Sequence, residues 1–153
     1  MELAVLTGIP GAGKSTFCAK HLKETHEHVS LDNWRGKKNR RRREETRIRE
    51  ALQAGRNVVV DNTNPTAAER ARYAAMAREL GAELVAYYFP VDRNGCLARN
   101  RRRADKKVVP DSGFFVILGK LQPPSRAEGF REIYIVKVAE NGGFSVEHAP
   151  DRG

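Results

Sequence analysis

The stretch Gly8-Ile-Pro-Gly-Ala-Gly-Lys-Ser15 has the pattern G-x-x-x-x-G-K-S of a phosphate-binding loop. An apolar run, 3–6, precedes it and predicts a buried strand, and a run without glycine or proline, 16–23, follows it and predicts a helix. A loop between a strand and a helix points several backbone N–H groups and the positive end of the helix dipole at one place. The stretch therefore predicts a nucleoside triphosphate site, against the alternative of a chance glycine-rich turn.

The loop also assigns expected roles to its residues. Lys14 would reach the β- and γ-phosphates, and the Ser15 hydroxyl would ligate Mg²⁺. We expect ATP, or another nucleoside triphosphate, as the phosphate donor, with Mg²⁺ as its companion ion. The residues expected to touch the nucleotide in this loop are Gly11, Ala12, Gly13, Lys14, Ser15 and Thr16.

Length and composition indicate a single domain over residues 1–153, in a chain with 40% hydrophobic residues and no tract long enough to cross a bilayer. The first predicted strand begins almost at residue 1, which leaves no room for a secretion signal. Cys18 and Cys96 are too few and too far apart for a metal framework, and each is expected as a small buried thiol in a helix. We expect a cytoplasmic protein whose cysteines are reduced and which has no membrane partner.

The net charge of +9 gathers in two segments. Residues 35–49 hold nine Lys/Arg against two Glu, and residues 93–107 hold seven against one Asp, so the rest of the chain carries −4. Concentrated positive charge in an otherwise mildly acidic domain indicates a polyanionic partner beyond the nucleotide. The alternative is a solvated helix face in the first segment and a nucleotide lid in the second.

The chain alternates predicted strands and helices. Strands are expected at 28–31, 57–60, 83–89 and 132–138, and helices at 38–53, 65–80, 92–104 and 111–121. Asn141-Gly-Gly143 predicts a turn, after which 144–147 would return as an antiparallel edge strand. This order predicts an α/β fold with a mainly parallel five-stranded sheet sandwiched by helices.

Two aspartates follow predicted strands and should meet the phosphate loop at one edge of the sheet. Asp61 ends a strand of three valines, as a metal-associated acid would, although it could simply be a turn residue. Asp32 ends another strand, with Arg35 three residues on, so a helical turn would place both side chains on one face. Such an acid could deprotonate a hydroxyl while the arginine holds a phosphate; the alternative for Asp32 is a helix cap.

Together these motifs resemble the 5′-hydroxyl polynucleotide kinase family, the phage and animal enzymes that phosphorylate DNA or RNA 5′ ends. The resemblance covers about residues 3–138 and keeps the family's order of motifs. The matching pieces are Gly8 to Thr16, Leu31-Asp-Asn-Trp-Arg35, Val60-Asp-Asn-Thr-Asn-Pro65, Arg99-Asn-Arg-Arg-Arg103 with Val108-Val-Pro110, and Pro124-Ser-Arg-Ala-Glu-Gly-Phe130. It implies an adenylate-kinase-like P-loop NTPase fold with an arginine-rich lid at about 99–113.

The resemblance also implies catalytic roles beside that of Lys14. Asp32 matches the general base that takes the proton from the 5′-hydroxyl, and Arg35 matches the arginine that grips the neighbouring phosphate. Arg103 resembles the lid arginine at the transferring phosphoryl group, with Arg99 as a companion at the nucleotide phosphates. Asp32 and Asp61 are further candidates for the Mg²⁺ site.

Three further residues are candidates for the nucleic-acid contact. Arg40 and Arg41 could extend the phosphate track, and Trp34 could stack on the terminal base or, alternatively, anchor its helix in the core. The chain is too short for the phosphatase or ligase domain of many relatives. We therefore expect a stand-alone kinase, or one module of a pathway shared with separate nucleic-acid repair enzymes.

Three functions follow from the sequence. The first is transfer of the ATP γ-phosphate to the 5′-hydroxyl of DNA or RNA. The second is a P-loop kinase of a small-molecule or nucleotide-sugar hydroxyl, which would not need the basic segment at 35–43. The third is a non-catalytic ATP-dependent binding module, which would have no use for the pair Arg99 and Arg103.

Overall fold

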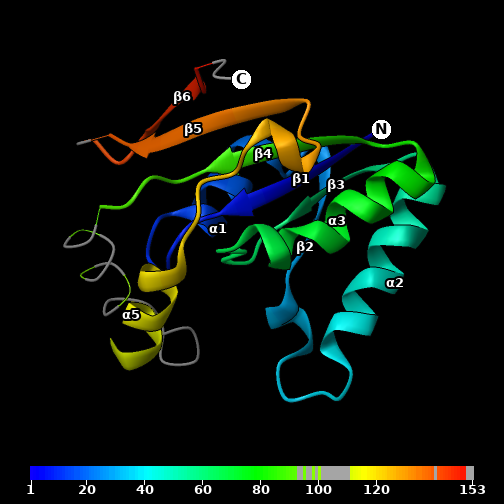
Figure 1. Ribbon diagram of the computed structural model, residues 1–153, viewed down its shortest axis with the longest axis horizontal. Helices are drawn as coiled ribbons and strands as arrows, with labels where there is room; N and C mark the ends of the chain where they lie inside the picture. Colours follow the sequence, from blue (N-terminus) through cyan, green and yellow to red (C-terminus); the bar gives the residue numbers. More distant parts are fainter. Residues whose placement is uncertain (93–94, 96–97, 99, 101–110, 140, 151–153) are drawn as a thin grey trace.

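The computed structural model describes residues 1–92, 95, 98, 100, 111–139 and 141–150. Its centre is a six-stranded sheet in the order β2-β3-β1-β4-β5-β6, in which the first five strands are parallel and β6 runs antiparallel to β5 (Figure 1). This confirms the predicted α/β fold and the returning edge strand. The strands are β1 (Glu2–Thr7), β2 (His26–Val29), β3 (Asn57–Val60), β4 (Glu83–Tyr88), β5 (Glu132–Val138) and β6 (Phe144–His148).

The helical elements of the described residues include four α-helices, one π-helical turn and two separate 3₁₀ turns. They are α1 (Lys14–Phe17), which continues as the π-helical turn η1 (Cys18–Leu22), the 3₁₀ turn η2 (Leu31–Trp34), α2 (Arg40–Gln53), α3 (Ala67–Leu80), α5 (Asp111–Lys120) and the 3₁₀ turn η4 (Arg126–Glu128). No helix within the described ranges is long and apolar enough to cross a lipid bilayer.

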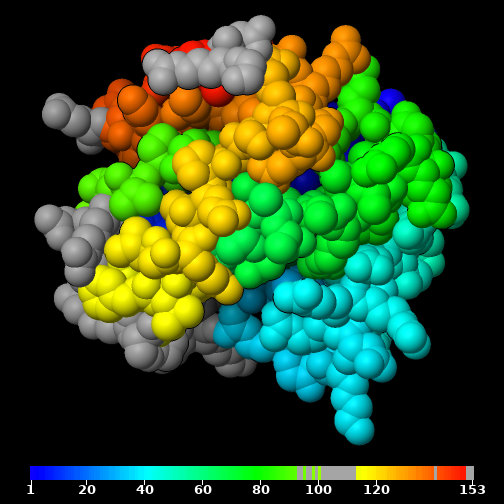
Figure 2. Space-filling model, in the orientation of Figure 1, coloured from blue at the N-terminus to red at the C-terminus, as the bar shows by residue number. Residues whose placement is uncertain are grey.

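Two apolar layers hold the helices on opposite faces of the sheet. Leu3 and Val5 of β1 pack in one buried cluster with residues of α2 and α3, while Ala4 and Leu6 pack in the other with residues of α1 and α5. The alternation follows from the pleat of a strand, which sends successive side chains to opposite faces. Little of β1, in dark blue, reaches the surface in Figure 2, as expected for a central strand.

The sequence placed some element boundaries wrongly, for identifiable reasons. The predicted helix at 65–80 begins at Ala67, because Thr66 adopts extended backbone and its hydroxyl accepts the Glu69 N–H at 3.1 Å. The strand predicted at 28–31 is instead β2, His26–Val29, and Ser30 caps the turn that follows.

The expected helix at 92–104 and the expected lid at 99–113 lie largely outside the described residues. Gly95, Ala98 and Asn100 are helical, and α5 begins at Asp111, the residue at which a helix was predicted to start. Arg99, Arg103 and Cys96 are not among the residues described. The arginine-rich lid therefore stays a prediction.

Candidate active site

The phosphate loop joins β1 to α1, and its backbone takes the conformations that its glycines permit. Gly11 and Gly13 have φ angles of 82° and 95°, in the left-handed region that other residues avoid. A Cβ on Gly13 would lie 3.2 Å from Cε1 of Phe144, the first residue of β6. The Gly8 N–H donates to the Thr63 carbonyl at 3.0 Å, which ties the loop to the segment after β3. The loop is thus held on two sides.

The lysine of the loop points back over it. The buried Lys14 Nζ donates to the carbonyls of Gly8 at 3.0 Å and Ile9 at 2.9 Å, so its charge lies at the mouth of the loop. Of the expected nucleotide contacts, Gly11, Gly13, Lys14, Ser15 and Thr16 line the pocket described below. Ala12 is buried in the apolar layer under the loop and is not among the residues that line the pocket.

Beside the loop, Asp61 is hydrogen-bonded to Ser15 and lies in contact with His28. The Ser15 hydroxyl donates to Oδ2 of Asp61 at 2.7 Å, and Nε2 of His28 lies 2.8 Å from the same oxygen. Burial by itself would raise the pKa of Asp61. The hydrogen bonds from His28 and Ser15 and the nearby charge of Lys14 outweigh burial, and the pKa of this carboxyl lies below its ordinary value. Asp61 is therefore held as a carboxylate next to the loop.

The pair Asp32 and Arg35 shares one face, as a helical turn predicts. Asp32 is the second residue of η2 and Arg35 directly follows this turn, while the hydroxyl of Ser30, which caps the turn, accepts the Asp32 N–H at 3.2 Å. The Arg35 guanidinium donates to Oδ1 of Asp32 at 2.9 Å, and about half of each side chain is exposed. The capping residue is thus Ser30, and the Asp32 carboxylate is left to face the solvent and its arginine.

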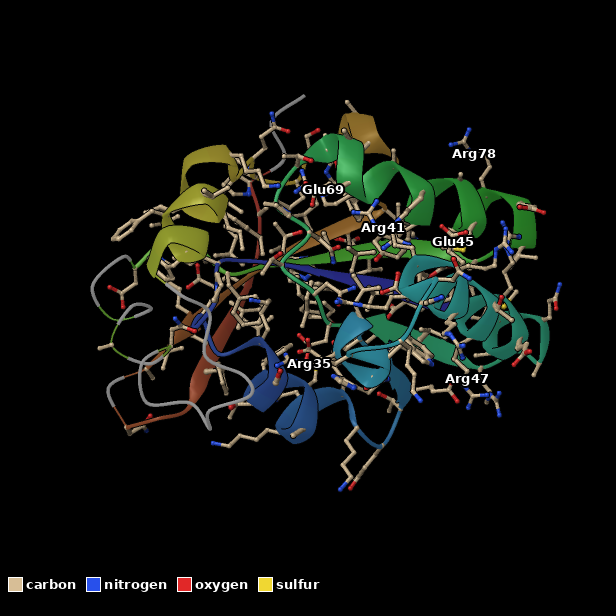
Figure 3. All side chains as sticks on the ribbon, turned by 90° about the horizontal axis from the view of Figure 1, so that it is seen from below. Arg35, Arg41, Glu45, Arg47, Glu69 and Arg78 are labelled. Carbon is tan, nitrogen blue, oxygen red and sulfur yellow. The ribbon has the colours of Figure 1, made fainter. Side chains whose placement is uncertain are left out.

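One pocket of about 400 Å³ brings these groups together. It is lined by Pro10, Gly11, Gly13, Lys14, Ser15, Thr16, Leu31, Asp32, Arg35, Arg40, Asp61, Asn62 and Thr63. Figure 3 shows Arg35 beside α1, the helix that follows the phosphate loop. The phosphate loop, the Asp32–Arg35 pair and Asp61 therefore face a common space, large enough for phosphates and part of a second substrate.

Two expected nucleic-acid contacts lie outside this lining. Trp34 is half-buried and packs against the apolar layer under α2 and α3, which is the anchoring alternative for this residue. Arg41 is exposed on α2, away from Arg35 in Figure 3, whereas Arg40, the first residue of α2, does line the pocket.

A buried polar network holds the turn that carries Asp32. The Asn62 side-chain oxygen accepts the Leu31 N–H at 2.9 Å, at the start of η2. Its amide nitrogen donates to Oε2 of the fully buried Glu44 at 2.7 Å and to the Tyr73 hydroxyl at 3.2 Å. Tyr73 and Arg72 donate to the other oxygen of Glu44, each at 2.7 Å. The network links α2 and α3 to the candidate site.

Sequence reasoning missed Glu44, Asn62 and His28 as parts of the site. Glu44 has a visible signal, because the buried residues of α2, Glu44, Ile48, Ala51 and Leu52, follow helical spacing and put the acid on the apolar stripe. His28 has no such sequence signal. Its contact with Asp61 depends on the pairing of β2 with β3, which the sequence alone does not reveal.

The motif at 124–130 contributes to the fold through an ion pair between Glu128 and Arg70. Arg70 on α3 is 1% exposed and forms a bidentate ion pair with Glu128. Its Nε donates to Oε1 at 2.8 Å, and its Nη2 donates to Oε2 at 3.0 Å. Arg70 also donates to the carbonyls of Asn64 and Gln122, each at 2.9 Å. Glu128 in turn closes a capping box with Ser125. The motif at 124–130 thus fixes α3 to the segment after α5.

Comparison with known families gives a match over most of the chain. The family model described as an AAA domain matches residues 3–124. A curated relative, the bifunctional polynucleotide phosphatase/kinase of Schizosaccharomyces pombe, is 28% identical over 138 residues, 86% of this chain. The putative bifunctional polynucleotide phosphatase/kinase of Acanthamoeba polyphaga mimivirus is 35% identical over 79 residues, 51% of the chain. The chain spans only 32% and 18% of the length of these two relatives.

Solved structures share the fold at low identity. A structure of the PezAT toxin–antitoxin system of Streptococcus pneumoniae has a TM-score of 0.74 at 15% identity, over 99% of this chain and 73% of the other. A fungal RNA kinase has a TM-score of 0.68 at 18% identity, over 91% and 38%. A gluconokinase of Sinorhizobium meliloti 1021 has a TM-score of 0.61 at 19% identity, over 91% and 83%. The fold is that of a nucleotide-binding P-loop kinase.

Proposed function

We propose that this chain, which belongs to the AAA domain family, is a kinase that transfers the γ-phosphate of ATP to the 5′-hydroxyl end of DNA or RNA. The observation that carries the proposal is the shared pocket, in which the phosphate loop faces the Asp32–Arg35 pair. The names of the two curated relatives support the acceptor class, and the sequence motifs that resemble the polynucleotide kinases include these same residues.

On the acceptor side, Asp32 is the proposed general base. Its Oδ1 accepts a hydrogen bond from Arg35, while its second oxygen has no partner within the described part of the chain. That oxygen could accept the proton of a hydroxyl as the hydroxyl oxygen attacks phosphorus. The Arg35 guanidinium has further N–H donors, which suit the phosphate next to a terminal nucleoside.

On the donor side, Lys14 and the backbone N–H groups of the loop would hold the triphosphate. The adjacent oxygens of Ser15 and Asp61, 2.7 Å apart, are of the type that Mg²⁺ prefers, so these residues fit the metal implied by the loop. When bound, Mg²⁺ supplies positive charge to the β- and γ-phosphates. Arg99 and Arg103 remain the predicted cationic contribution from the lid.

The basic segment supports a polyanionic acceptor. Arg47 and Arg49 pair with Glu27 and Glu79 at 2.7 and 2.8 Å, so this end of α2 is neutralised by neighbours. The cations earlier in the segment, of which Arg40 lines the pocket, are exposed and have no ion pair among the described residues; they are Lys37, Lys38, Arg40, Arg41 and Arg42. Figure 1 shows that the loop before α2 lies at the lower edge of the molecule, open on its outer side. Unpaired charge of this kind suits a phosphate backbone more than a small alcohol.

The direct test is a transfer assay with labelled ATP, Mg²⁺ and a short 5′-hydroxyl DNA or RNA strand, with gluconate in a parallel arm. We expect label on the strand, and none on an otherwise identical strand that already carries a 5′-phosphate. Label on gluconate but on no strand would overturn the proposal in favour of a small-molecule kinase. ATP binding without transfer to either would favour the binding module.

Two variants and one control assign the roles. Asp32→Asn is expected to lower kcat by about 10²-fold or more while ATP binding is kept, as for loss of a general base. Arg35→Ala is expected to raise the KM for the strand more than the KM for ATP. Arg47→Ala, an arginine of the same segment that pairs with Glu27, is the matched control and should change neither. Loss of ATP affinity in Asp32→Asn would reassign that acid to the metal or to the fold.

A further inference from the structure

A cluster of three metal-ligating side chains lies under the phosphate loop, apart from the Asp32–Arg35 pair. The Cys18 thiol, the His28 imidazole and the Asp61 carboxylate each offer one ligand atom, and these atoms lie within 4.8 Å of one another. They come from three separate elements: η1, β2 and the residue after β3. The function proposed above uses neither Cys18 nor His28.

The fold explains why the three side chains meet. In the pairing of β2 with β3, His28 stands opposite Val59, whose side chain belongs to the apolar layer that also contains Cys18. Asp61 follows β3 two residues after Val59 and accepts hydrogen bonds on the same side. Cys18, the first residue of η1, is buried in that layer, so the helix brings its thiol to the same face of the sheet. The convergence is therefore set by strand order and helix position.

The ligand atoms differ in chemistry from the oxygen pair of Ser15 and Asp61. Mg²⁺ prefers oxygen ligands, whereas Zn²⁺ accepts a cysteine sulfur, a histidine nitrogen and a carboxylate oxygen together. Three protein ligands with one open position form a regular zinc arrangement. Cys18 and Asp61 are almost fully buried, while the His28 side chain is 42% exposed, which leaves a route by which an ion can enter.

We propose that Cys18, His28 and Asp61 bind a Zn²⁺ ion. Ligand atoms of a tetrahedral zinc site lie about 3.5 Å apart, so the 2.8 Å contact of His28 with Asp61 must open slightly and a pair at the 4.8 Å limit must close by roughly 1 Å; the half-exposed His28 ring can adjust. Binding replaces the contact between His28 and Asp61 and releases the Cys18 thiol proton to solvent.

The ion would also act on the nucleotide site. Oδ2 of Asp61 is the acceptor of the Ser15 hydroxyl, so a carboxylate held by zinc is withdrawn from the oxygen pair that suits Mg²⁺. Zinc is therefore an antagonist of Mg²⁺–ATP binding at this loop. This consequence rests on the proposed kinase function, whereas zinc binding itself does not.

The test of binding uses the full chain, freed of metal and nucleotide, with Zn²⁺ titrated against a chromogenic zinc chelator. We expect one zinc ion per chain, at least tenfold weaker binding in His28→Gln, and unchanged binding in His148→Ala, which removes an exposed histidine elsewhere. Unchanged zinc affinity in His28→Gln would overturn the proposal.

Cobalt identifies the sulfur ligand. Co²⁺ in place of Zn²⁺ should give a thiolate-to-cobalt charge-transfer band that is lost in Cys18→Ser and kept in Cys96→Ser. A band that is absent from the parent chain, or that survives in Cys18→Ser, would contradict the assignment. Because these readouts need no polynucleotide, they stand or fall separately from the proposed kinase activity.

Antagonism is measured as the Kd of Mg²⁺–ATP with and without equimolar Zn²⁺. We expect at least a tenfold weakening in the parent chain and less than a twofold change in His28→Gln. Zinc that binds without weakening Mg²⁺–ATP would overturn the proposed competition for Asp61.

Discussion

Replacement of Asn62 by alanine tests whether the buried network holds the candidate site. Asn62 makes one bond to the Glu44 carboxylate at 2.7 Å and three to neutral partners, the Leu31 N–H at 2.9 Å, the Tyr73 hydroxyl at 3.2 Å and the Ser30 hydroxyl at 3.4 Å. A bond to a charged group contributes about 1.5–3 kcal/mol and a neutral one about 0.5–1.5 kcal/mol. These bonds share one half-buried side chain that water can partly replace, so we expect a loss of about 3 kcal/mol of unfolding free energy, at the low end of their sum.

The measurement is denaturant unfolding at neutral pH, with thermal unfolding beside it. A loss of about 3 kcal/mol corresponds to a fall of roughly 6–12 °C in Tm for a chain of this size. Asn33→Ala is the matched control, because Asn33 lies in the same turn with an exposed side chain, and it should change the stability by less than about 0.5 kcal/mol.

A second substitution separates the two ends of the Asn62 amide. Asn62→Asp keeps the acceptor for Leu31 but turns a second carboxylate toward Glu44, so it should be at least as unstable as Asn62→Ala near neutral pH. A loss below about 1 kcal/mol in Asn62→Ala would refute the reasoning, since the turn that carries Asp32 would then be held by other contacts.

Three further predictions concern the rest of the fold. Arg70→Met leaves the Glu128 carboxylate without its buried partner and should cost about 3–5 kcal/mol in denaturant unfolding; a cost near zero would mean that the pair contributes nothing to the fold. Gly8→Ala would put a Cβ 2.9 Å from Cβ of the buried Phe89 and should cost about 1–3 kcal/mol, with weaker ATP binding by calorimetry; full stability would show that the loop can shift. Burial is the main cause that raises the pKa of all four tyrosines, that of Tyr87 to about 12, so the unfolded chain ionises first and stability should fall as the pH rises above 10. Phenolate absorbance should appear at higher pH in the folded than in the denatured protein, and coincident titrations would contradict the assignment.

Much of the fold was predictable because local signals and tertiary packing agree. β3 and β5 have the bounds predicted from the sequence, 57–60 and 132–138, and more than half of the residues in each are β-branched. Gly81 ends α3 in the left-handed conformation expected of a helix terminator, with φ 72°. The phosphate loop is recognisable from its pattern because its glycines are required by its backbone.

The contacts between distant segments were not predictable. Helical spacing puts Glu44 on the apolar stripe of α2, but its partners Tyr73 and Arg72 lie on α3, and no local pattern states that these two helices pack together. The contact of His28 with Asp61 depends on the pairing of β2 with β3, and no local pattern states which strands are neighbours. The sequence thus indicated which residues could form the pocket, but not which side chains hold them in place.

The contact of Gly13 with the hairpin of β5 and β6 bears on how the protein acquires activity as it is made. Within the described part of the chain, the residues that line the pocket lie between Pro10 and Thr63, and they leave the ribosome early. The ring of Phe144, which closes over Gly13 and packs edge-on against Phe17 with centroids 5.4 Å apart, is translated long afterwards. A growing polypeptide therefore carries these pocket-lining groups well before the aromatic cover arrives, and tight nucleotide capture should await the closing hairpin.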